Sequence, residues 1–454
     1  MTLQKFTLVS LLAFSHLTSA QIINTKGIVK QIDSLERSVE RIESQVSQKV
    51  TDRPFALSTL PPIDELLTEP LTLLPKTLAI GENLGKPLFV EVETEDGWRA
   101  IQNQWVVLAN PQTKQHLIAL GAFINSETNY SGLGLSLLRF TVPESLDSKQ
   151  ALAKHLPEQT LESLDRNHIY QAQTAAPQAQ SSVTGQNLEN SASKALCDTP
   201  VKIGMIDSGI DQQHGAFADA IIIAKSFLVD DLSSPQAHGT AVASVLVGDL
   251  GPLTPLLSHG KVYSAEVFYR QSDYSQGATL DAMITALNWL VEEQIKVVNM
   301  SLAGPPNKML ATIIKAASQQ GTIIVAAAGN QGPAAPELYP AGYPEVIAVS
   351  AFDKQQQPYR WSNRGDYVDY SALGVNVVTA QVKRGLGKES GTSMAAPVVS
   401  AALSCLLTES GHRNSVDRQA ILTSLSDLAV DLGPKGRDPI YGIGGIVRNL
   451  GESN

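Results

Sequence analysis

Apolar residues in the second half of the chain gather in short β-branched runs that alternate with stretches of helical period. Four of these runs read as buried strands, at 201–206, 296–300, 322–327 and 346–350. Strands of this kind that alternate with helices are typical of a parallel sheet covered by helices on both faces. We therefore expect an α/β domain over residues 197–454, built as a doubly wound parallel sheet.

The region from 98 to 172 has a different pattern. Strands are predicted at 105–109, 133–142 and 168–171, and helices at 111–120 and 147–155, the first of which opens with Pro111. This order favours a small α+β unit with no obvious chemistry of its own. Residues 173–196 are dominated by Gln, Ala, Ser and Asn and show no period, which predicts an exposed linker that proteases can cut.

The segment 21–97 is predicted to be helical at first and then rich in Leu and Pro. Apolar residues recur at alternating spacings of four and three, at Ile28, Ile32, Leu35, Val39, Ile42 and Val46, and Pro54 ends the run. The period is that of a coiled coil, although fewer than three heptads are present. Two interpretations remain open: an amphipathic helix packed on its own chain, and self-association through residues 28–50.

The first twenty residues have the pattern of a cleavable signal peptide. Lys5 precedes an apolar stretch at 6–14, and small residues at 18–20 offer a cleavage site after Ala20. A membrane anchor is the alternative, but the apolar run is far shorter than the roughly 20 residues that a spanning helix needs. We expect no later segment to be long and apolar enough to span a bilayer, and we expect a secreted or periplasmic protein.

Composition excludes several classes of protein. The 454 residues are 43% hydrophobic and 17% charged, which is enough apolar material for a large core. A formal net charge of -10 argues against a nucleic-acid partner, since such proteins present a basic face. The only two cysteines, Cys197 and Cys405, exclude a zinc ribbon, an iron–sulfur protein and a small disulfide scaffold.

Three short motifs in the α/β region place reactive side chains where a parallel sheet collects them. Asp207 ends the first strand, and ligand or catalytic groups cluster at the carboxyl ends of such strands. His238 begins a helix in the run His-Gly-Thr, and Ser393 begins another in Ser-Gly-Thr-Ser-Met-Ala-Ala-Pro (390–397). A helix N-terminus directs backbone N–H groups at any negative charge that develops beside the serine.

These motifs, in the chain order acid, histidine, serine, resemble those of the subtilisin-like serine peptidases. The resemblance covers residues 198–450 and includes further stretches at 298–302, 326–330, 339–341, 346–349, 436–438 and 441–442. The order differs from that of chymotrypsin-like enzymes and of α/β-hydrolases. The resemblance implies a nucleophile at Ser393, a general base at His238 and an orienting acid at Asp207. It also implies an oxyanion hole formed by the Asn330 side-chain amide and the backbone N–H of Ser393.

The resemblance also gives the upstream unit a role. The stretches 135–143 and 164–170 resemble an inhibitory prodomain, which would occupy the cleft of its own enzyme until self-cleavage within or just before the linker. A permanent accessory domain is the alternative. The partners implied are protein or peptide substrates and the prodomain itself.

Substrate preference is only weakly marked. The segments 301–304 and 326–329 resemble those that flank the main specificity pocket, with Ser301, Ala303, Gly304, Ala328 and Gly329 as the candidate binding residues. Their small side chains would leave room for large apolar residues. The stretch 248–260 lacks the Asn-rich loop with which many relatives bind calcium, so we predict no cofactor and no metal there.

The two cysteines lie on elements that run away from the active site toward the same end of the domain. A Cys197–Cys405 disulfide is therefore geometrically allowed in an oxidising compartment, and two buried free thiols are the alternative. The functional hypothesis is a self-processing serine endopeptidase. Its alternatives are an inactive binding or assembly protein on the same scaffold, and an esterase that uses the same triad.

Overall fold

The computed structural model describes residues 74–81, 86–172, 195–229, 232, 234–272, 275–383, 385–409 and 417–447. All of them lie in the second of the chain's two compact units, Thr72–Asn454. The expected signal peptide, the helix at 28–50 and nearly all of the linker fall outside the described residues.

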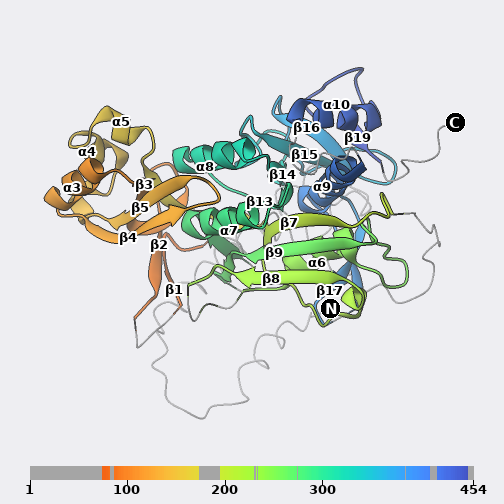
Figure 1. Cartoon of the computed structure of the whole chain (residues 1–454), viewed down its shortest axis with the longest axis horizontal. Coiled ribbons are helices and arrows are strands. Elements are labelled where there is room, and N and C mark those ends of the chain that lie inside the picture. Colours follow the sequence, from red (N-terminus) through yellow and green to blue (C-terminus); the bar gives the residue numbers. More distant parts are fainter. Residues whose placement is uncertain are drawn as a thin grey trace, which may run out of the picture. The chain divides into compact units, whose positions relative to one another are not determined.

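An eight-stranded parallel sheet forms the centre of the C-terminal domain, in the order β19-β16-β15-β14-β12-β7-β9-β8 (Figure 1). The predicted strands are present as β7, β12, β14 and β15, each within two residues of its expected bounds. The strands of this sheet are β7 (Val201–Asp207), β8 (Ile221–Ser226), β9 (Gly260–Glu266), β12 (Val297–Met300), β14 (Ile323–Ala327), β15 (Val346–Phe352), β16 (Val368–Leu373) and β19 (Gly445–Ile446).

Helices cover both faces of this sheet, so the doubly wound prediction is confirmed. Along β14, Val325 packs into the cluster that contains residues of α6 and α9, whereas Ile324 and Ala326 pack with residues of α7 and α8. Side chains alternate across a strand, so these two pairs of helices lie on opposite faces. The helices of the domain are α6 (Ala237–Val247), α7 (Leu280–Glu292), α8 (Lys308–Gln319), α9 (Thr392–Glu409) and α10 (Arg418–Leu428), and a hairpin of β17 (Val377–Gln381) and β18 (Gly385–Glu389) lies beside them.

The predicted α+β unit is present, with one strand that the sequence interpretation missed. Its elements are β3 (Arg99–Leu108), α3 (Pro111–Ala119), β4 (Phe123–Tyr130), β5 (Leu135–Thr141), α4 (Lys149–Ala153), α5 (Glu158–Leu161) and β6 (Asp165–Ala172). Trp105, Leu138, Phe140 and Leu152 form its fully buried centre. The missed strand is β4, which offers few apolar residues because its side chains alternate between exposed and half-buried positions.

The predicted boundary at residue 98 is wrong. β1 (Thr77–Ile80) and β2 (Phe89–Glu93) form an antiparallel hairpin, and β2 pairs with β3 from Glu91 to Glu93. The described residues before 98 therefore extend the sheet of the α+β unit and are not helical. Alternation of apolar residues and glutamate in 89–93 was the signal for a strand there.

The same sheet continues into the C-terminal domain. β6 pairs antiparallel with β11 (Gln276–Thr279) and with β13 (Leu302–Ala303), and β11 pairs with β10 (Phe268–Arg270). The last strand of the α+β unit thus lies between two strands of the domain that follows it in the sequence. This insertion fixes residues 169–172 beside the segment that the sequence marked for substrate binding.

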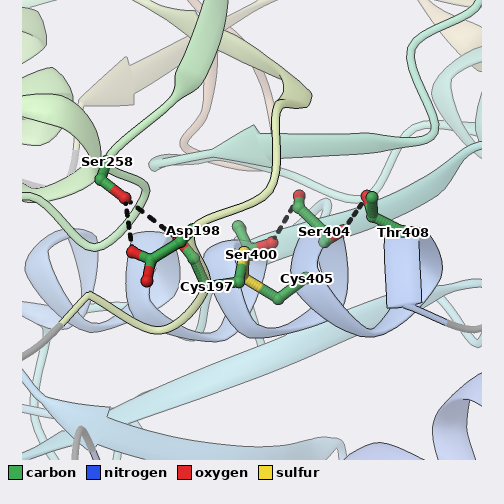
Figure 2. Close-up of a disulfide and its surroundings, with 7 residues drawn as sticks. All are labelled: Cys197, Asp198, Ser258, Ser400, Ser404, Cys405 and Thr408. Carbon is green, nitrogen blue, oxygen red and sulfur yellow. Dashed lines mark hydrogen bonds between the residues drawn. A yellow bond between two sulfur atoms is a disulfide. The ribbon is translucent and has the colours of Figure 1, made fainter.

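A disulfide joins Cys197 to Cys405 of α9, with an S–S distance of 2.10 Å (Figure 2). The first described residues of the domain also pair with the loop before β9, where Leu196 N–H donates to Leu256 O. Ser258 Oγ donates to Asp198 Oδ1 at 3.0 Å. The start of the domain is therefore attached both to that loop and to the helix that begins beside Ser393.

One expectation about membranes needs correction. Among the described helices, α9 alone has the length and apolar composition that a bilayer span requires, although the sequence analysis expected no such segment. Most of α9 is buried inside the domain, between α6, α10 and the sheet. Its apolar composition is explained by this central position.

Candidate active site

Asp207 and His238 form a buried pair at the carboxyl edge of the parallel sheet. Asp207 is the last residue of β7, and His238 is the second residue of α6. His238 Nδ1 lies 2.7 Å from Asp207 Oδ1, and that oxygen also accepts the backbone N–H of Ser208 at 2.7 Å. Gly239 allows this approach, because a Cβ there would lie 2.3 Å from Ser208 O.

The environment raises the pKa of His238 above its ordinary value. Burial disfavours the charged imidazolium, but the charge of Asp207, its hydrogen bond to the ring and the charge of Glu389 together outweigh burial. Within the described residues, the second ring nitrogen, Nε2, is buried and has no hydrogen-bond partner. A histidine with Nδ1 held by a carboxylate has Nε2 as its proton-accepting atom.

Ser393 lies at the N-terminus of α9, on the same edge. It is the second residue of that helix and is only 1% exposed. Its backbone carbonyl accepts a hydrogen bond from Ser301 Oγ at 3.1 Å, and Asn299 Nδ2 donates to Ser301 Oγ at 2.9 Å. The helix start is thereby held against the strand that ends at Met300.

Asn330 lies close to the start of α9. Its side-chain Oδ1 accepts hydrogen bonds from the backbone N–H of Thr392 at 2.9 Å and from Thr392 Oγ1 at 3.0 Å. Thr392 Oγ1 also accepts the backbone N–H of Gly329 at 3.2 Å. Because Oδ1 faces Thr392, the orientation of the amide is fixed, and Nδ2 is the donating half of that side chain.

The sequence interpretation missed Asn299 and Thr392, which support this site. Asn299 is fully buried in an otherwise apolar strand, and Ser400 Oγ of α9 donates to its Oδ1 at 3.2 Å. A polar residue within the run Val-Val-Asn-Met was the available signal, since a buried amide needs partners.

The candidate substrate-binding residues have different surroundings. Ala303 pairs with Gln171 of β6, and a Cβ on Gly304 would lie 2.5 Å from the ring of Tyr170. Ser301 instead faces Ser393, as described above.

The second candidate segment has its own contacts. Ala328 O accepts a hydrogen bond from Tyr367 Oη at 2.9 Å, and Gly329 adopts φ +120°, which a residue with a side chain rarely does.

Tyr170 occupies the position against Gly304. It is fully buried, and its hydroxyl donates to Pro305 O at 3.1 Å. The next two residues, Gln171 and Ala172, pair with Ala303 and Leu302. The chain's own strand β6 therefore lies along the extended segment 301–304, which the sequence analysis assigned to substrate binding.

Among the described residues, no group of three or more His, Cys, Asp or Glu side chains could hold a metal ion. The expectation that no calcium binds at 248–260 stays a prediction.

The parallel sheet, its two helical layers and the groups at its carboxyl edge define an α/β protein of the subtilisin-like fold. The chain belongs to the subtilase family, whose family model matches residues 198–444.

Curated relatives agree with this assignment. The minor extracellular protease Epr of Bacillus subtilis is 29% identical over 54% of this chain and 37% of its own length. The major intracellular serine protease of the same organism is 32% identical over 45% of this chain and 68% of its own length. For subtilisin E, also from B. subtilis, the values are 31%, 48% and 58%. The chain thus spans only part of each relative.

Among solved structures, fervidolysin from Fervidobacterium pennivorans, described as a keratinolytic enzyme related to subtilisin, matches 88% of this chain and 65% of its own. Its TM-score is 0.62 and its identity 18%, so the likeness concerns the fold.

Proposed function

We propose that this chain is the precursor of an exported serine endopeptidase that uses Asp207, His238 and Ser393. The observation that carries the proposal is the buried Asp207–His238 contact of 2.7 Å at the sheet edge where the helix of Ser393 begins. Membership of the subtilase family supports the reaction class. The signal-like N-terminus and the extracellular relative Epr support export.

In this mechanism Ser393 Oγ attacks the carbonyl carbon of a peptide bond, and His238 Nε2 takes the serine proton. Asp207 holds the ring through Nδ1 and stabilises the imidazolium. The tetrahedral intermediate collapses, His238 returns the proton to the leaving amine, and an acyl-enzyme remains. Water, activated by the same histidine, then hydrolyses the ester and restores Ser393.

Charge on the intermediate needs donors that are in place before it forms. The Nδ2 group of Asn330 and the backbone N–H of Ser393 supply them in this proposal. The bonds from Thr392 to Asn330 Oδ1 hold that amide in one orientation, so little reorganisation accompanies the reaction.

Residues 98–172 act as the inhibitor of the enzyme in the same proposal. The support is the insertion of β6 between β11 and β13, with Tyr170 against Gly304. Self-cleavage between β6 and Cys197 would free the extended segment for other peptides. Broad cleavage of exposed protein segments is the expected activity.

Casein clearing by purified wild type beside Ser393→Ala tests the proposal. Clearing by wild type alone is the expected result, and the Ser393→Ala chain should stay uncleaved. Equal clearing by both chains, or by neither once the N-terminal part has been removed, would contradict a peptidase. Hydrolysis of simple esters without casein clearing would favour the esterase alternative, and full binding without any turnover would favour the scaffold alternative.

The raised pKa of His238 predicts how kcat/KM falls at acid pH. A general base works only when unprotonated, so the processed enzyme should lose kcat/KM as the pH falls, with a midpoint above the ordinary histidine value of about 6.5. Glu389→Gln should move this midpoint to lower pH, because one of the charges that raise the pKa is removed. A midpoint below 6.5, or one that Glu389→Gln leaves in place, would count against His238 as the base.

The environment of His168 predicts that the stability of the precursor also depends on pH. Its Nδ1 accepts a hydrogen bond from Asn307 Nδ2 at 2.8 Å, which requires an unprotonated ring nitrogen. The pKa of His168 is lowered to about 4, mainly because burial disfavours its charge; Lys149 and Arg166 lower it further, and Asp165 and Asp96 oppose them.

In the unfolded chain, where it is exposed, His168 binds a proton below about pH 6.5. In the folded precursor it stays unprotonated down to about pH 4. The unfolded chain therefore binds more protons in this window, and acidification should cost up to about 3 kcal/mol of stability. Urea unfolding of the Ser393→Ala precursor at pH 7, 5 and 4 measures this. His168→Gln should flatten the dependence, whereas substitution of the exposed His155 should not; equal slopes for all three chains would refute the assignment.

A further inference from the structure

The hairpin β1–β2 packs against the face of β6 that carries Ile169. Ile169 of β6 packs in one apolar cluster with Ile80, Ile101 and Tyr269, and Phe89 packs against this cluster. Phe89 meets the ring of Tyr269 edge to face, with centroids 5.2 Å apart. Tyr170, the next residue of β6, faces the opposite way, against Gly304. The inserted strand is therefore enclosed between the C-terminal domain and the hairpin.

A buried carboxylate lies where the hairpin β1–β2 meets the C-terminal domain. The Glu91 side chain is completely buried. It accepts hydrogen bonds from Tyr269 Oη at 2.7 Å, from Gln271 Nε2 at 2.8 and 3.0 Å to its two oxygens, and from Arg99 Nε at 2.6 Å. Arg99 belongs to the α+β unit, whereas Tyr269 and Gln271 belong to the C-terminal domain, on β10 and just after it.

The hydrogen bonds that Tyr269 and Gln271 donate to Glu91 contribute to docking of the hairpin on the C-terminal domain, whereas the bond from Arg99 lies within the α+β unit itself. An ionised carboxylate removed from water is costly unless hydrogen bonds replace its hydration. Arg99 supplies one replacement within the α+β unit, and the others exist only while the hairpin is docked. Burial and the neighbouring charge of Glu91 raise the pKa of Tyr269 well above its ordinary value, so its hydroxyl keeps the proton that it donates.

We propose that the C-terminal domain carries a second binding site, formed by Tyr269 and Gln271 outside the peptide-binding strands β11 and β13, for a carboxylate on an extended strand. In the precursor its ligand is Glu91. The site retains the N-terminal piece after the linker has been cut, and so prolongs inhibition. This last consequence rests on the self-processing proposed above, whereas the binding site itself does not.

The test uses the full chain with Ser393→Ala, so that no activity of its own interferes. A recognition sequence for an unrelated protease is placed within residues 173–194, the chain is nicked there, and the half-time for release of the N-terminal piece after dilution is measured by size-exclusion chromatography. Tyr269→Phe deletes a single hydroxyl without touching the α+β unit. Loss of one hydrogen bond to a charged group corresponds to release faster by roughly 10- to 100-fold.

Further variants test whether the hydrogen bond between Tyr269 and Glu91 is the cause of the changed release rate. Glu91→Gln should accelerate release as well, and the double variant should differ little from the faster single one, because both changes remove the same interaction. Tyr263→Phe on β9, whose ring packs on Trp289, and Glu93→Gln, on the same strand but exposed, should leave release unchanged. Should Glu91→Gln fail to fold, Tyr269→Phe still decides.

Unchanged release in Tyr269→Phe, or strictly additive effects in the double variant, would overturn the proposal. Failure of the proposed function would look different, since wild type would then neither cut its linker nor clear casein while the nicked chain still reported release.

Discussion

Asn330→Ala is expected to give a folded protein that turns over peptide about 10²–10³-fold more slowly, a magnitude taken from the corresponding asparagine of subtilisin itself. In the proposed mechanism the amide donates to the oxyanion only as negative charge develops, so kcat should fall while KM stays near normal. Self-processing should slow in parallel. Steady-state kinetics on a chromogenic peptide, with the melting temperature measured beside them, check this.

The hydrogen bonds of Asn330 also suggest a rival, structural role. Its Oδ1 accepts from Thr392 N and Oγ1, so Asn330→Ala also removes support for the start of α9. Asn330→Asp separates the two roles, because it keeps an acceptor for Thr392 but replaces the N–H donors by a negative charge. We expect Asn330→Asp to be at least as impaired in kcat as Asn330→Ala. A stable, active Asn330→Asp beside an unstable Asn330→Ala would assign Asn330 to the turn instead.

Removal of the Cys197–Cys405 bridge is expected to produce the largest loss of stability. The bridge spans 208 positions in the sequence. In the chain-entropy model, closure of a loop of that length lowers the entropy of the unfolded chain by an amount worth about 5 kcal/mol. Urea unfolding of Cys197→Ala/Cys405→Ala, made with Ser393→Ala to prevent self-digestion, should show a loss of this size.

Reduction provides the matched control for this prediction. A reductant should destabilise the chain that has both cysteines to nearly the level of the double variant, and it should have no effect on the double variant itself. Thiol labelling of the denatured, unreduced chain should find no reactive group. Two reactive thiols per chain would mean that the bridge does not form in solution.

Much of the fold was predictable because its signals are local. The strands β7, β12, β14 and β15 are buried at nearly every position, so their sequences are predominantly apolar and can be recognised locally. The hairpin β1–β2 was missed for the opposite reason. Its few apolar residues face a cluster that is completed by Ile169 and Tyr269, far away in the sequence.

The candidate site shows the same division. Asp207, His238 and Ser393 could be selected because each stands in a short motif at the end of a strand or the start of a helix. Asn299 and Thr392 support the start of α9 through contacts across the sheet edge. The polarity of Asn299 within an apolar run was the one local signal, and it does not identify the residues that Asn299 contacts.

The sequence by itself determined the α/β class, because strand periodicity is contained within a few neighbouring positions. Its short motifs, through their resemblance to those of subtilisin-like peptidases, also singled out Asp207, His238 and Ser393 as the candidate reactive residues. Only the tertiary structure decided that β6 lies between β11 and β13, and that Glu91 finds its donors on Tyr269 and Gln271. Those pairings join residues more than one hundred positions apart. They depend on burial and hydrogen-bond partners that exist only once both parts of the chain have folded against each other.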